Sequence, residues 1–122
     1  MFSIVIPLYN EGENIKPLLS EIFANLTSYE NFEIVLINDA STDNTSNIIK
    51  NVKDDRVRIL HNETNRGQSF SIHKGIQYSS FDTIITIDGD GQNDPADIPK
   101  LINKYFESNK LKLLGGIRSK RK

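Results

Sequence analysis

The stretch Phe2-Ser3-Ile4-Val5-Ile6-Pro7-Leu8-Tyr9-Asn10-Glu11 begins as an apolar, largely β-branched run and ends in polar residues. Such a run predicts a buried strand over Phe2–Leu8, followed by a loop. Similar runs farther along the chain predict four more strands, over Phe32–Asn38, Val57–His61, Thr83–Asp88 and Lys112–Ile117.

Helical patterns lie between these strands. Apolar residues recur at spacings of three and four from Ile15 to Leu26 and from Ile98 to Phe106, which predicts two amphipathic helices. Asp94 before Pro95 is expected to cap the second of them. Shorter helices are predicted over Asp43–Val52 and Gln68–Tyr78. Strands alternating with helices predict an α/β fold, a doubly wound, mostly parallel sheet flanked by helices in the Rossmann-like manner.

Composition narrows the class of protein. The chain has 122 residues, of which 37% are hydrophobic and 25% charged, as expected of one globular domain. The absence of cysteine excludes a disulfide scaffold, a thiolate metal site and a cysteine nucleophile. The net charge of −1 argues against a nucleic-acid partner.

The basic residues are unevenly placed along the chain. Of 15 Lys and Arg residues, four lie in the last five positions, Arg118, Lys120, Arg121 and Lys122. This tail suits a phosphate group or an anionic membrane surface; the alternative is that it is simply solvated. No apolar run reaches the length of a membrane span and no signal peptide precedes the first strand. We therefore expect a cytoplasmic protein, peripheral at the inner face of the membrane.

Acidic side chains follow three of the predicted strands. Glu11, Asp39, Asp88 and Asp90 are expected to meet at one rim, because parallel strands present their carboxyl ends at the same edge. So many carboxylates repel one another unless a cation or hydrogen-bond donors offset their charge, or unless they share protons. Asp88, Asp90 and Gln92 offer the hard oxygen ligands that Mg²⁺ or Mn²⁺ prefers, so we expect a divalent cation there.

Other interpretations of these carboxylates stay open at this point. The Asp88-Gly89-Asp90-Gly91 segment also suits an ordinary turn. The rim carboxylates would on another interpretation only cap helices and turns, the role expected of Asp43 and Asp94. A phosphatase of the haloacid-dehalogenase type likewise places Asp-x-Asp after a strand, with the first Asp, here Asp88, as nucleophile.

Four segments, in chain order, resemble the motifs of family 2 inverting glycosyltransferases with the glycosyltransferase-A fold. They are Val5-Ile6-Pro7-Leu8-Tyr9-Asn10-Glu11 with Asn14-Ile15, Ile37-Asn38-Asp39-Ala40-Ser41-Thr42-Asp43-Asn44-Thr45, Asn65-Arg66-Gly67, and Ile87-Asp88-Gly89-Asp90-Gly91-Gln92. The branch that they resemble is that of the polyprenyl-phosphate sugar transferases, which includes dolichol-phosphate mannosyltransferase. The resemblance covers nearly the whole chain, and four linked motifs are far more specific than one.

The resemblance implies roles for individual residues. Those expected to bind the nucleotide are Pro7, Tyr9, Glu11, Asp39, Asp88 and Gly89. Within this set, Asp39 would accept a hydrogen bond from the nucleobase, and Asp88 would lie beside the ribose and the metal.

The resemblance also implies a catalytic centre. Asp90, helped by Gln92 and Asp88, would hold the divalent ion that bridges the diphosphate of the donor. Arg118 resembles an arginine that meets the acceptor phosphate. Family members commonly read Asp-Asp-Gly-Ser where this chain has Asn38-Asp39-Ala40-Ser41, so the first carboxylate is lost and Asp39 is kept. Gly89 stands where alanine is usual.

The implied reaction is the transfer of a sugar, with inversion, from a UDP- or GDP-linked donor to a polyprenyl phosphate. Such an acceptor is already anionic and needs no general base, and the sequence offers no obvious base. Residues 1–122 would form the nucleotide-sugar-binding part of one glycosyltransferase domain whose acceptor-binding part is absent. The alternative is a nucleotide-binding module without turnover. An uncovered sheet edge would favour a homodimer, or pairing with the absent part.

Overall fold

The computed structural model describes residues 1–89, 94–107 and 117–119. Its strands form one five-stranded sheet in the order β3-β2-β1-β4-β5. They are β1 (Phe2–Leu8), β2 (Phe32–Asn38), β3 (Val57–His61), β4 (Thr83–Thr86) and β5 (Ile117–Ser119). The first four strands run parallel, and β5 runs antiparallel to β4.

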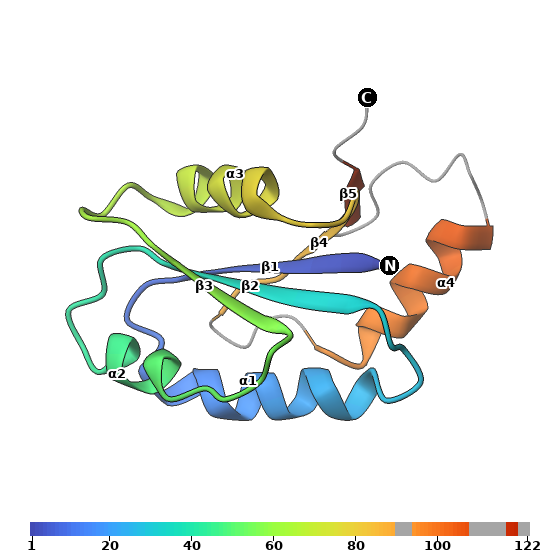
Figure 1. The fold of residues 1–122 in the computed structure, drawn as a ribbon, viewed down its shortest axis with the longest axis horizontal. Helices are drawn as coiled ribbons and strands as arrows, with labels where there is room; N and C mark the ends of the chain where they lie inside the picture. Colours follow the sequence, from blue (N-terminus) through green and yellow to red (C-terminus); the bar gives the residue numbers. More distant parts are fainter. Residues whose placement is uncertain (90–93, 108–116, 120–122) are drawn as a thin grey trace.

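Helices cover both faces of the sheet. They are α1 (Gly12–Asn25), α2 (Thr45–Lys50), α3 (Gln68–Tyr78) and α4 (Asp97–Glu107). Figure 1 shows α3 alone on one face and α1, α2 and α4 on the other. The expected doubly wound, mostly parallel α/β sheet is thereby confirmed.

Several boundaries differ from the prediction. Strand β4 ends at Thr86 instead of Asp88, and α2 is confined to Thr45–Lys50. The last described strand is Ile117–Ser119 and is antiparallel, whereas residues 112–116 of the predicted strand lie outside the described residues.

Helix α4 begins at Asp97, not at Pro95. The carboxylate of Asp94 accepts a hydrogen bond from the backbone N–H of Ala96 at 2.9 Å. The N–H of Asp97 donates to the carbonyl of Asp94 at 2.9 Å. Asp94 thus stabilises a turn ahead of the helix, because a short acidic side chain competes with helical hydrogen bonding.

Alternate residues of the central strands supply two hydrophobic cores. The even-numbered side chains of β1 and β2, such as Ile4 and Ile34, pack with α1 and α4 in the larger core. Val5, Val35, Ile37 and Ile84 form the smaller one on the face that α3 covers. This double burial explains the near-continuous apolar runs of the sequence, since parallel strands are covered on both faces.

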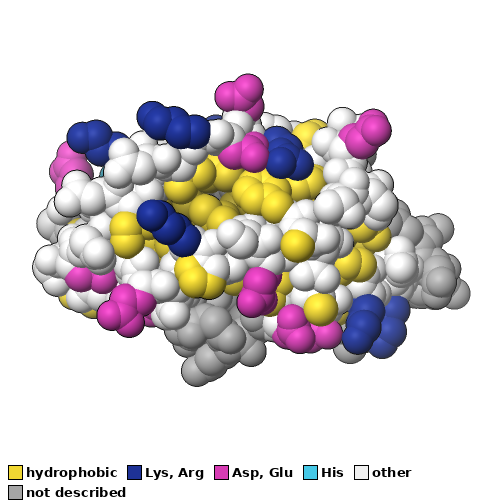
Figure 2. Space-filling model, turned by 90° about the horizontal axis from the view of Figure 1, so that it is seen from below, with side chains coloured by type: hydrophobic (Ala, Val, Ile, Leu, Met, Phe, Trp, Pro, Cys, Tyr) yellow, Lys and Arg dark blue, Asp and Glu magenta, His cyan; other side chains and the backbone are white. Residues whose placement is uncertain are grey.

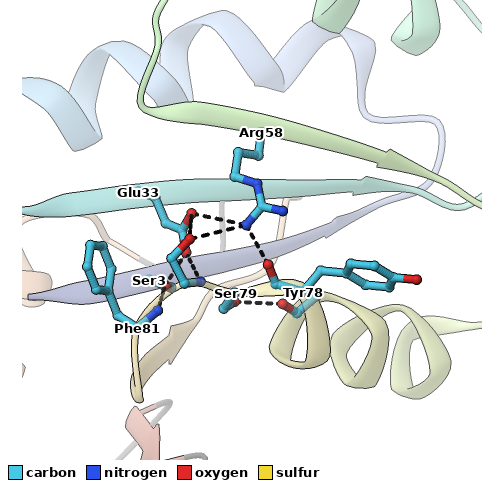
Figure 3. Close-up of polar contacts among 8 residues, drawn as sticks. Ser3, Glu33, Arg58, Tyr78, Ser79 and Phe81 are labelled. Carbon is cyan, nitrogen blue, oxygen red and sulfur yellow. Dashed lines mark hydrogen bonds and ion pairs between the residues drawn. The ribbon is translucent and has the colours of Figure 1, made fainter.

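A polar cluster interrupts the smaller core near the amino ends of the strands (Figure 3). Glu33, which is only 7% exposed, accepts a hydrogen bond from the Ser3 hydroxyl at 2.6 Å. Its carboxylate also accepts from the Ser80 backbone N–H and from Arg58, the latter at 3.3 Å. Arg58 in turn donates to the carbonyl of Tyr78, the last residue of α3. The cluster therefore ties β1, β2 and β3 to the end of α3.

Strand β3 lies at the edge of the sheet, and the side chains of Val57–Leu60 are only half-buried. Figure 2 shows the face formed by α1, α2 and α4, where hydrophobic side chains gather in a hollow between charged ones. The homodimer stays a prediction.

Of the helices in the described part, none combines the length and the apolar character needed to cross a bilayer.

Candidate nucleotide-sugar site

The candidate site is a hollow of about 310 Å³ at the carboxyl ends of β1 and β4. Strand β1 pairs with β2 on one side and with β4 on the other. The chain order reverses there, and this is where open parallel sheets bind their ligands. The lining residues come from the β1, β2 and β4 ends and from α3: Pro7, Leu8, Tyr9, Glu11, Asp39, Gln68, Ser71, Asp88 and Gly89.

All six residues that the sequence predicts to bind the nucleotide line this hollow. The hollow is also lined by three residues that were not predicted from the sequence, Leu8, Gln68 and Ser71. The signal for the last two was the Asn65-Arg66-Gly67 motif, which immediately precedes α3 and so brings the start of that helix to the hollow. The structure thus brings the predicted nucleotide-binding residues together; what they bind is a separate question.

Asp39 follows β2 and is buried, with an exposure of 4%. One carboxylate oxygen accepts hydrogen bonds from the Arg66 N–H at 2.7 Å and from the Asn62 amide at 2.8 Å. The other accepts from the Gly67 N–H at 2.9 Å. Burial alone raises the pKa of Asp39, but these hydrogen bonds outweigh it and bring the pKa below its ordinary value. Asp39 is therefore ionised at neutral pH and organises the loop before α3.

The loops after β1 and β2 are joined by side chains. The side-chain Oδ1 of Asn10 accepts hydrogen bonds from the backbone N–H of Thr42 at 2.8 Å and of Asp43 at 3.2 Å. The Asp43 carboxylate accepts from the Gly12 N–H at 3.2 Å and from the Thr45 N–H at 2.9 Å. Asp43 thus satisfies a backbone donor at the start of each of two helices, which extends its expected capping role.

Two non-glycine residues in these loops adopt left-handed backbone conformations, Asn10 with φ 54° and Ala40 with φ 56°. Asparagine tolerates this region well, whereas alanine is strained there. Ala40 occupies the position at which the family that the sequence resembles commonly has glycine. The strain sits next to Asp39, and the three hydrogen bonds of that carboxylate help to hold the loop in place.

Gly89 lies where β1 approaches the segment after β4. A Cβ at this position would come within 2.5 Å of the Leu8 side chain and 3.2 Å of the Pro7 carbonyl oxygen. Glycine therefore lets the Asp88–Gly89 segment lie directly against the end of β1. Nearby, the Gln68 amide donates a hydrogen bond to the Asp88 carboxylate at 2.6 Å, which joins α3 to the end of β4.

The predicted metal ligands are only partly described. Asp88 lines the hollow, whereas Asp90 and Gln92 lie outside the described residues. Among the described residues, no group of three or more His, Cys, Asp or Glu side chains is arranged to hold a metal ion. The chemistry of the donors fits a hard cation, because Asp88 and Glu11 both bring carboxylates to the hollow.

Arg118 lies in β5, where its backbone pairs with Ile84 of β4. Ile84 lies nearer the amino end of β4 than Asp88 does, and the Arg118 side chain is outside the described part of the structure. The contact of Arg118 with an acceptor phosphate stays a prediction.

The chain matches known proteins in both sequence and fold. Residues 3–121 match the family model described as glycosyl transferase family 2. The chain belongs to glycosyl transferase family 2. Its strands β1–β4, its helices and the hollow at the sheet switch point are thus those of a family 2 protein.

Two curated relatives show which family 2 proteins it resembles. The chain is 38% identical to dodecaprenyl-phosphate galacturonate synthase of Rhizobium johnstonii, over 98% of the chain and 36% of that protein. It is 42% identical to undecaprenyl-phosphate 4-deoxy-4-formamido-L-arabinose transferase of Shewanella sediminis, over 86% of the chain and 33% of that protein. The chain thus spans about a third of the length of these relatives.

Solved structures share the fold of this family 2 chain. A mannosyltransferase from Pyrobaculum calidifontis, in complex with GDP-Man and Mn²⁺, superposes with a TM-score of 0.76 at 19% identity, covering 90% of this chain and 33% of that one. S. aureus TarS in complex with UDP-GlcNAc superposes with a TM-score of 0.70 at 22% identity, covering 88% and 32%. At such identities the likeness concerns the fold alone.

Proposed function

We propose that this chain is the donor-binding part of a glycosyltransferase that moves a sugar from a UDP- or GDP-linked donor to a polyprenyl phosphate, with inversion. The observation that carries the proposal is that Pro7, Tyr9, Glu11, Asp39, Asp88 and Gly89 line one hollow of about 310 Å³. These residues lie at or just beyond the carboxyl ends of three strands, β1, β2 and β4, of a family 2 chain.

Asp39 is suited to recognise a nucleobase. A carboxylate has about four acceptor sites, and three protein donors are bound to this one, so capacity for a further donor is left. The ionised form is the acceptor, and the lowered pKa maintains it. Tyr9, which is 45% exposed at the rim, offers an aromatic surface to the base or ribose.

A divalent cation bound beside Asp88 would act as a Lewis acid that stabilises the charge developing on the leaving nucleoside diphosphate. Asp88, Asp90 and Gln92 are the residues proposed to hold it. The mannosyltransferase of the same fold was solved with Mn²⁺, which supports the choice of metal without establishing it for this chain.

The acceptor is proposed to be a polyprenyl phosphate because both curated relatives are named for such lipids. A phosphate is anionic at neutral pH, so attack on the sugar needs no proton transfer from it. Arg118 and the basic residues that follow it would meet the lipid phosphate at the membrane surface. The protein would then act peripherally at the inner face of the membrane.

A thermal-shift and calorimetric screen of UDP, GDP and their sugars, with Mn²⁺ or with EDTA, tests donor binding. Ligands that bind the folded state raise the melting temperature. We expect Asp88→Asn to abolish most of the shift, whereas Asp55→Asn, an exposed carboxylate in the segment before β3, leaves it unchanged. The absence of a shift with every nucleotide would contradict the proposal.

Transfer to a polyprenyl phosphate is assayed separately, by following label from the nucleotide sugar into lipid. Binding without transfer would favour the alternative, a nucleotide-binding module without turnover, which is a real candidate because the chain spans only about a third of its relatives. The phosphatase alternative rested on the Asp-x-Asp spacing alone, and family membership removes that reason.

A further inference from the structure

Gln68 joins two walls of the hollow that are far apart in the sequence. It is the first residue of α3, and Asp88 follows β4. The Gln68 Nε2 donates to the Asp88 Oδ1 at 2.6 Å, and both side chains line the hollow. Helix α3 packs against β1 and β2, so this bond links the β1–β2 side of the hollow with its β4 side.

The backbone at Gln68 is held from the opposite wall. Gly67, directly before it, has φ 94°, a conformation that glycine adopts without strain. The N–H groups of Arg66 and Gly67 both donate to the carboxylate of Asp39, at 2.7 Å and 2.9 Å. Asp39 therefore fixes the start of α3, and the start of α3 places the Gln68 amide against Asp88.

We propose that Gln68 is a positioning residue, which holds the Asp88 carboxylate in the orientation that receives the donor nucleotide. This inference rests on the function proposed above. The torsion that turns a carboxylate about its own axis has broad minima, so a fixed donor is needed to set it. An amide donor orients the carboxylate of Asp88 without cancelling its negative charge. That charge is what would attract a divalent cation or accept a hydrogen bond from a ribose hydroxyl. A lysine in this position would neutralise that charge.

The test is a calorimetric titration of UDP and of GDP into the 122-residue chain, once with Mn²⁺ and once with EDTA. Gln68→Leu removes the donor and keeps similar bulk. Because a hydrogen bond to a charged group is lost, we expect nucleotide affinity to fall about tenfold. Loss in both solutions identifies direct contact of Asp88 with the nucleotide, and loss with Mn²⁺ alone identifies an ion held by Asp88; either result supports the proposal.

Two further variants separate positioning from a general effect on the fold. Gln77→Leu is the matched control, because Gln77 is exposed on the same helix and does not line the hollow. The nucleotide affinity of Gln77→Leu is expected to match that of the unaltered chain. The melting temperatures of Gln68→Leu and Gln77→Leu are also expected to match that of the unaltered chain. Gln68→His at pH 8, which keeps a neutral N–H donor of similar reach, is expected to recover most of the affinity.

Three results would overturn the proposal. They are unchanged affinity in Gln68→Leu, an equal loss in Gln77→Leu, and a Gln68→His variant as weak as Gln68→Leu. If the unaltered chain binds nucleotide and Gln68→Leu binds it equally well, only the role of Gln68 fails. If the unaltered chain binds neither UDP nor GDP in either solution, the proposed function fails together with this inference.

Discussion

Glu33 of β2 and Asp39, the residue directly after β2, hold opposite ends of α3. Asp39 binds the backbone N–H groups of Arg66 and Gly67 just before the helix. Glu33 binds the N–H of Ser80 just after it. Strand β2 supplies the first carboxylate, and the loop that begins directly after it supplies the second. Helix α3, which forms a wall of the hollow, is therefore fixed at both ends by carboxylates from β2 and from the residue that follows it.

Replacing Glu33 by glutamine should destabilise the fold. The amide keeps the shape of the side chain but loses the charge-assisted bonds with Arg58, Ser80 and Ser3. We expect a loss of about 1–3 kcal/mol in the free energy of unfolding, measured by urea denaturation. Asp54→Asn is the control, because its ion pair with Arg56 at 3.0 Å is on the surface and should contribute less than about 1 kcal/mol. Equal losses in the two variants would contradict a special role for Glu33.

The stability of the protein should decrease in acid. Burial alone raises the pKa of Glu33, but hydrogen bonds from Ser3, Ser80 and Arg58 bring it below its ordinary value of 4.5. A lowered folded-state pKa gives a contribution that is present above the unfolded-state value and lost as the pH falls through the folded-state value. Unfolding free energies measured between pH 7 and pH 3 should therefore fall below about pH 5. The unfolding free energy of Glu33→Gln should fall less steeply with decreasing pH. An identical pH dependence in the variant and the unaltered chain would rule out Glu33 as a source of the acid sensitivity.

Ala40→Gly should stabilise the protein. Ala40 has φ 56°, a conformation that costs a residue with a Cβ roughly 1–2 kcal/mol, whereas glycine adopts it freely. The greater flexibility of glycine in the unfolded chain offsets part of this gain, so we expect a net increase of about 1 kcal/mol in unfolding free energy.

Asn10→Gly is the contrasting variant, because Asn10 has a similar φ of 54°. Its side chain accepts hydrogen bonds from Thr42 and Asp43, and glycine would lose them. We expect this variant to be less stable than the unaltered chain. Stabilisation by both substitutions would show that side-chain bonds between the two loops contribute little.

Gly75→Ala should loosen α3 from the sheet. A Cβ at this position would lie 2.5 Å from the Val5 side chain and 2.7 Å from that of Ile37. Overpacking of this kind costs about 1–3 kcal/mol, and we expect nucleotide binding to weaken because α3 carries Gln68 and Ser71. Ser69→Ala, on the exposed side of the same helix, should change stability by less than about 0.5 kcal/mol. Melting curves and the UDP and GDP titrations measure both effects.

The boundaries that could be predicted from the sequence are those that local patterns determine. β1, β2, β3 and α3 have the predicted limits, because an apolar run or a helical repeat ends at each boundary. The start of α4 was wrong because the Asp94 side chain competes for a backbone donor that a helix would otherwise use. The antiparallel direction of β5 could not be predicted from the sequence, because pairing with β4 is a long-range choice.

By itself the sequence determined the fold class, the family and the six predicted residues of the hollow. The apolar runs, the helical repeats and the order of the four motifs can all be recognised without knowing which segments meet in space. Only the tertiary structure decided that Gln68 meets Asp88, that Asp39 anchors the loop before α3, and that Glu33 is buried with Arg58. These contacts join residues at least 20 positions apart. They depend on which strands become neighbours in the sheet. The order of the strands is determined by the packing of many side chains together, so no single segment of the sequence reveals it.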